Sequence, residues 1–105
     1  MRGASYDYLN QPEQAKDDYT KCISLFPDNE FAYVNRGAIL FEENRYKEAL
    51  DDFNKAISLS PGGNYYLNRS YCYFKLGDLI KAKEDMQTAI RKGETVSVEY
   101  QNALK

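Results

Sequence analysis

The feature that most constrains this chain is an internal repeat with a period of 33 to 34 residues. Residues 17–27 recur as residues 51–61 at an offset of 34, and residues 84–90 form a more diverged third copy at an offset of 33 from the second. A second block recurs at the same two offsets, around Arg2, Arg36 and Arg69. Two blocks that agree on one period predict stacked copies of a single supersecondary unit.

Each unit is predicted to contain two helices. In the second unit the apolar residues of the later helix fall three and four apart, which places them on one helix face; they are Tyr46, Ala49, Leu50, Phe53, Ala56 and Ile57. The preceding segment, 31–41, is denser in apolar residues, as expected for a helix contacted on several sides. Pro27 and Pro61 end helices, Asp28 or Asn29 caps the next one, and Asn44 and Gly77 supply turns.

This pattern resembles the tetratricopeptide repeat, which combines an aromatic, a glycine, alanines and a proline within two helices. The second unit carries the motif at Tyr33, Gly37, Ala49, Phe53, Ala56 and Pro61. The first unit matches at Gly3, Tyr6, Ala15, Tyr19 and Pro27, and the third at Tyr66, Tyr73, Gly77, Ala82 and Ala89. The third unit departs from the motif at Ser70, Met86 and Glu94. The resemblance implies an all-α fold, a right-handed superhelical solenoid of helix-turn-helix repeats.

The predicted organisation is a single domain over residues 1–105 with about seven helices. It divides into a partial repeat at 1–29, full repeats at 30–62 and 63–93, and a capping helix at 94–105. Aligning Arg2 with Arg36 places Met1 opposite Asn35, so the first helix lacks its opening turn. Two interpretations fit: a fragment of a longer array, or a truncated helix that pairs with a second copy.

Composition excludes several classes of function. Fourteen Lys and Arg against sixteen Asp and Glu give a net charge of -2, which argues against binding DNA or RNA. No apolar run is long enough to span a membrane, and no signal peptide follows Met1. We expect no membrane insertion and a cytoplasmic location. Without histidine, and with only Cys22 and Cys72, the chain offers no metal site, no cofactor site and no imidazole base, so we expect no enzyme.

The resemblance also implies a function, because tetratricopeptide arrays bind peptides or helices on a concave face lined by the first helix of each pair. The residues carried over as peptide-binding are Val34, Asn35, Ala38, Phe41, Leu67, Asn68, Arg69, Tyr71, Phe74 and Lys75; Glu42 and Asn64 belong to the same face. Exposing this apolar stripe costs roughly 25 cal/mol per Å², so a ligand, the terminal helix or an upstream repeat should cover it. For Phe41 both explanations stand, whereas for Phe74 we favour a ligand.

Narrower hypotheses follow from single residues. Asn35 and Asn68 are equivalent and resemble the asparagine ladders of O-linked N-acetylglucosamine transferases, which hold a peptide backbone. Hydrogen bonds between repeats explain two such asparagines at least as well. The carboxylate clamp of tetratricopeptide co-chaperones matches only at Asn35 and Arg69. The main alternative to a peptide-binding scaffold is self-assembly, including a homo-oligomer formed through the truncated first helix.

Overall fold

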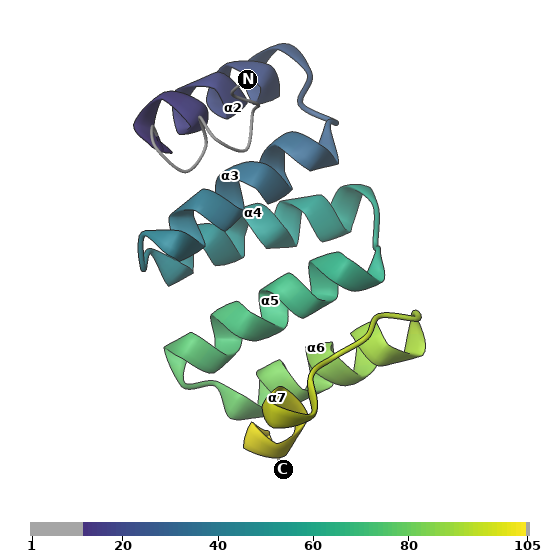
Figure 1. Cartoon of the computed structure of the whole chain (residues 1–105). Coiled ribbons are helices and arrows are strands. Elements are labelled where there is room, and N and C mark those ends of the chain that lie inside the picture. Colours follow the sequence, from purple (N-terminus) through teal and green to yellow (C-terminus); the bar gives the residue numbers. More distant parts are fainter. Residues whose placement is uncertain (1–11, 105) are drawn as a thin grey trace, which may run out of the picture.

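The computed structural model describes residues 12–104, which form six α-helices and no strand (Figure 1). The helices are α2 (Pro12–Leu25), α3 (Glu30–Glu42), α4 (Tyr46–Leu59), α5 (Gly63–Leu76), α6 (Leu79–Arg91) and α7 (Val98–Ala103). The truncated first helix of the prediction falls on residues outside the described range. The all-helical repeat architecture that the sequence predicts is therefore confirmed.

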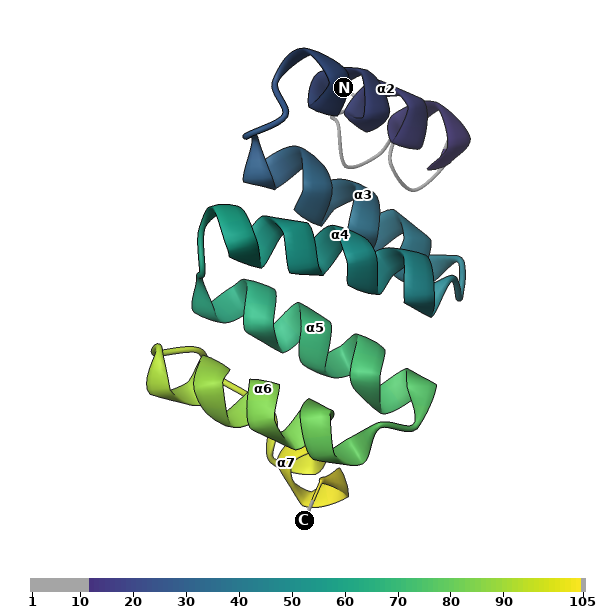
Figure 2. The same ribbon diagram turned by 180° about the vertical axis from the view of Figure 1, so that it is seen from behind.

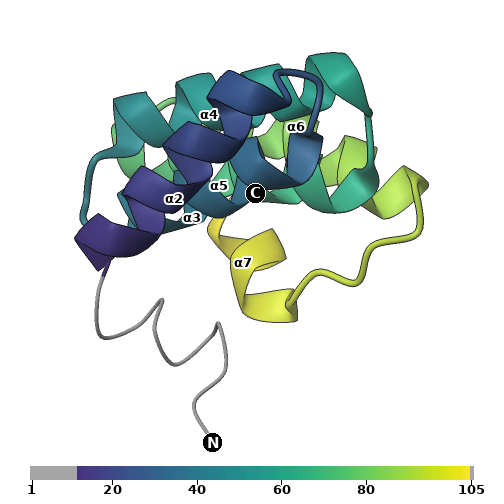
Figure 3. The same ribbon diagram turned by 90° about the horizontal axis from the view of Figure 1, so that it is seen from above.

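The helices stack in two layers. The pairs α3/α4 and α5/α6 are antiparallel hairpins that follow one another along the stack (Figures 1 and 2). Seen from above, α4 and α6 lie in one layer, α3 and α5 lie in the other, and α7 lies beyond α5 on the outer side of that second layer (Figure 3). This arrangement leaves the outer faces of α3 and α5 as the surface that the predicted binding residues share.

Local chemistry sets the helix ends. Asn29 caps α3 by accepting hydrogen bonds from the backbone N–H groups of Phe31 and Ala32, as Asp78 does for α6 from Lys81. The turn after α5 needs a left-handed residue, which Gly77 supplies with φ of 88°. The last helix is shorter than the predicted 94–105 because Ser97 caps it only from Val98 onwards.

The core lies between the layers and depends on small residues. Ala49, Ala56, Ala82 and Ala89 are fully buried where the helices approach one another. Gly37 is required by the same geometry, because a Cβ atom there would lie 2.9 Å from Cε1 of Phe53. At the equivalent place in the third repeat stands Ser70, which is fully buried, and the counterpart of Phe53 there is Met86.

An arginine–aspartate pair fastens the two helices of each hairpin. Arg36 donates to Asp52 through Nε (2.8 Å) and Nη2 (2.7 Å), and Arg69 donates to Asp85 through Nε (2.7 Å) and Nη2 (2.8 Å). Both carboxylates are buried, and hydrogen bonding to them raises the pKa of each arginine. These bidentate pairs satisfy charges that would otherwise be costly in the core.

No helix in the described part of the chain is long and apolar enough to cross a membrane.

Candidate functional site

The site begins with the outer face of α3. Residues spaced by three, four and seven positions share one face of a helix, which groups Val34, Asn35, Ala38 and Phe41. Asn35 is exposed, whereas the other three are half-buried. Phe31 belongs to the same face and is 62% exposed, so the apolar stripe begins one turn earlier than the sequence-based list of binding residues.

A hollow opens where this stripe meets α5. It is lined by Ala38, Phe41, Glu42, Phe53, Asn68 and Tyr71, and its volume is about 290 Å³. Four of these six are among the residues predicted to bind a partner. Their convergence produces a mostly apolar recess with the Asn68 amide and the Glu42 carboxylate at its polar side.

Phe53 is the lining residue that the sequence analysis assigned only to the core. It is 2% exposed, yet it lines the hollow from α4. The signal that could have revealed it is Gly37, because the absence of a side chain there lets the Phe53 ring approach α3 closely.

The part of the predicted binding face that lies on α5 is partly covered by the chain's own C-terminal segment. Tyr100 of α7 packs edge-on against Tyr71 (ring centroids 4.6 Å apart) and against Phe74 (5.5 Å). Leu67 and Phe74 pack against the cluster formed by α6 and the buried Val96 and Leu104. Phe74, for which we favoured a ligand, therefore contacts the terminal helix instead.

Tyr100 is held by its hydroxyl as well as its ring. Its hydroxyl lies 2.7 Å from Oγ of Ser70, and Ser70 in turn donates to the carbonyl of Ala82 (2.6 Å). Burial raises the pKa of Tyr100 to about 12. The serine that departs from the repeat motif thus fastens α7 to α5.

Arg69 is occupied by intramolecular partners. In addition to Asp85, it donates through Nη1 to Oδ1 of Asn54 (2.9 Å), and its guanidinium lies over the rings of Tyr66 and Tyr73. All three of its nitrogen atoms therefore have acceptors within the chain. Lys75 is exposed at the end of α5 and does not line the hollow.

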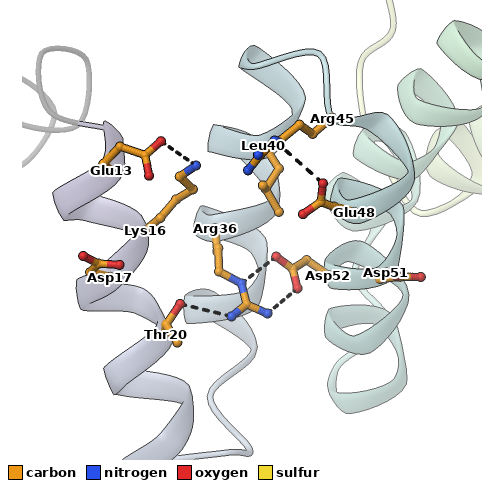
Figure 4. A pocket seen from close by; sticks show the side chains of 10 residues that line it. All are labelled: Glu13, Lys16, Asp17, Thr20, Arg36, Leu40, Arg45, Glu48, Asp51 and Asp52. Atoms are coloured by element: carbon orange, nitrogen blue, oxygen red, sulfur yellow. Dashed lines mark hydrogen bonds and ion pairs between the residues drawn. The ribbon is translucent and has the colours of Figure 1, made fainter.

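A second, larger hollow of about 470 Å³ lies between α2, α3 and α4 (Figure 4). Its side chains are mostly charged and paired with one another. Lys16 contacts Glu43 (2.6 Å) and Glu13 (2.9 Å), and Arg36 bridges Asp52 and Thr20 (3.2 Å to the latter). Hydrogen bonding to Glu43 raises the pKa of Lys16. This network links the first repeat to the second. Each cation that lines the hollow has a carboxylate partner among residues 12–104; these cations are Lys16, Arg36 and Arg45.

Neither cysteine belongs to a metal-binding group. Among the described residues no three His, Cys, Asp or Glu side chains gather as metal ligands. Cys72 is fully buried, and burial raises the pKa of its thiol to about 12, so the thiolate that metal binding and nucleophilic chemistry need is disfavoured.

Comparisons with known proteins agree with this architecture. Two family models, each described as tetratricopeptide repeat, match residues 31–62 and residues 1–29 and 63–91. Among solved structures, the first TPR of Spaghetti (RPAP3) bound to the HSP90 peptide SRMEEVD is similar, with a TM-score of 0.82 and 28% identity over 93% of this chain and 79% of that one. MamA AMB-1 shares the fold, with a TM-score of 0.77 and 24% identity over 92% of this chain and 54% of that one. No curated protein matches. The chain belongs to the tetratricopeptide repeat family.

Proposed function

We propose that this chain is a non-catalytic scaffold that binds a segment of a partner protein in the hollow between α3 and α5. The observation that carries the proposal is the convergence of Phe41 and Tyr71 on an open, mostly apolar recess. Aromatic side chains at such a recess are typical anchors of protein interfaces. The similar domain of RPAP3, whose structure holds an HSP90 peptide, supports a peptide or a short helix as the bound segment.

The geometry also suggests how a segment is held. Asn68 lies at the hollow and its amide both donates and accepts hydrogen bonds, which suits a peptide backbone. Exposed Asn35 and Phe31 lie on the same face of α3, and extend the contact beyond the hollow. Because α7 covers Phe74, the proposed contact runs along α3 and ends at Tyr71.

A peptide-display experiment tests this proposal. We expect a random peptide library panned on the chain to yield peptides whose affinity falls about tenfold or more for Ala38→Leu, which fills the hollow with an apolar side chain. Ile80→Leu, an exposed change on α6, is the control and should leave binding unchanged. Peptides that bind Ala38→Leu as well as the parent protein would place the site elsewhere.

The same samples test the alternative of self-assembly. A monomeric mass by light scattering across a concentration series supports an open hollow. A dimer that Ala38→Leu dissociates would mean that a second copy, rather than a separate partner, occupies it.

A further inference from the structure

The hollow presents one sign of charge. Of its six lining residues only Glu42 is ionised, and this carboxylate is exposed at the end of α3. No ion pair to Glu42 is formed within residues 12–104. A bound segment therefore meets an apolar recess with an adjacent negative charge.

The basic residues that an acidic ligand would need are already engaged. Arg36 and Arg69 each make two hydrogen bonds to an aspartate whose side chain is only 6% or 7% exposed. Drawing either arginine toward a ligand would leave its buried aspartate without a counter-charge, which is strongly unfavourable. Lys75, the counterpart of Glu42 one repeat later, remains exposed but does not line the hollow.

The recess itself sets the size of the anchor. Its volume of about 290 Å³ is at the lower limit of ligand pockets, which span about 300–1,000 Å³, so it suits one or two side chains. Phe41, Phe53 and Tyr71 supply ring surface for an aliphatic or aromatic group. Burying such a group is the main favourable contribution available here.

We infer that the segment bound in this hollow carries a bulky apolar anchor with a lysine or arginine next to it, and not an acidic chain end. The inference rests on the proposed function and specifies its ligand. The anchor fills the space between Phe41 and Tyr71, and the cation lies against Glu42. Charge complementarity of this kind contributes mainly to specificity and association rate.

Charge reversal at Glu42 provides the test. The probe is a random dodecapeptide library displayed on phage, and we expect the enriched sequences to place Leu, Ile, Met or Phe within two positions of Lys or Arg. A synthetic peptide of the enriched sequence should bind Glu42→Lys about three- to tenfold more weakly, with Glu42→Gln between them. Glu84→Lys makes the same change at an exposed position of α6 and should leave affinity unchanged. Circular dichroism checks that each variant keeps its helices.

The outcomes separate the inference from the function on which it rests. Enrichment of acidic sequences, or equal affinity for the parent and Glu42→Lys, overturns the inference, while sensitivity to Ala38→Leu would still support binding in the hollow. If no enriched peptide is sensitive to Ala38→Leu, both the inference and the proposed function are wrong.

Discussion

At the scale of single residues, Gly37 and Phe53 form a matched pair whose counterpart one repeat later is Ser70 and Met86. A Cβ atom at Gly37 would lie 2.9 Å from Phe53 and 3.1 Å from Cβ of Asp52. We expect Gly37→Ser to lower the free energy of unfolding by about 1–3 kcal/mol through overpacking. In a Phe53→Met background the same change should cost about 1 kcal/mol less, because the flexible methionine can yield. Urea unfolding of the parent, both single variants and the double variant measures this coupling. Strictly additive effects would contradict it.

Residue identities predicted the motif positions well and the polar partners poorly. Gly37 and the buried alanines followed from spacing, and local chemistry narrowed the cap of α3 to Asp28 or Asn29, of which the structure has Asn29. The acceptors of Arg69 were not predicted, because a basic side chain on a helix more often projects into solvent. A signal was present: Arg36–Asp52 and Arg69–Asp85 both lie 16 residues apart, and the repetition of that spacing in two units indicates a structural pair.

At the scale of elements, the attachment of α7 predicts a dependence of stability on alkaline pH. The pKa of Tyr100 is raised to about 12 by burial, whereas tyrosine in the unfolded chain titrates near 10. The folded state therefore keeps a proton that the unfolded state releases, and stability is lost as the pH rises from about 10 towards 12. The slope is at most about 1.4 kcal/mol per pH unit.

Tyr100→Phe isolates this effect. The variant keeps the ring contacts with Tyr71 and Phe74 but loses the Ser70 hydrogen bond, so at pH 8 it should be less stable by about 1 kcal/mol. Between pH 10 and 12 the difference should shrink, because the variant has no phenol to ionise. The raised pKa of Cys72 acts in both proteins and cancels in the comparison. Urea unfolding of the parent and Tyr100→Phe at several pH values measures the difference in stability between them. Parallel profiles of stability against pH would show that Tyr100 titrates normally.

The sequence predicted a terminal helix and offered it as one possible cover of the binding face, but it predicted neither the length of this helix nor that it would cover Phe74. A six-residue helix is too short to be stable alone, so tertiary contacts decide where it lies. Here those contacts are Tyr100 with the α5 aromatics and Val96 and Leu104 with Ala82 and Met86. Such long-range packing cannot be inferred from a local hydrophobic pattern. For this reason the sequence analysis favoured a ligand, and not α7, as the group that covers Phe74.

At the scale of the whole molecule, the interface between successive repeats changes along the stack from charged at α2 to apolar between α3, α4 and α5. Between α3, α4 and α5 a continuous cluster buries Leu40, Ala49, Phe53 and Cys72. Among the described residues of α2 the only buried one is Lys16, whose side chain is still 11% exposed and donates a hydrogen bond to Glu43. Repeat proteins unfold by units whose stability depends on their nearest-neighbour interfaces. The first repeat should therefore open more readily than the second and third.

Hydrogen exchange can resolve this gradient. We expect the amides of α2 to exchange faster than those of α4 and α5, and Lys16→Met to accelerate exchange in α2 by about 5- to 30-fold, equivalent to about 1–2 kcal/mol. Removing the lysine leaves Glu43 without its strongest partner but does not alter the apolar cluster, so α5 and α6 should keep their protection. Lys21→Met, an exposed change on the same helix, is the matched control. Uniform acceleration across all helices would instead mean that the stack unfolds as one unit, with the charged network contributing to global rather than local stability.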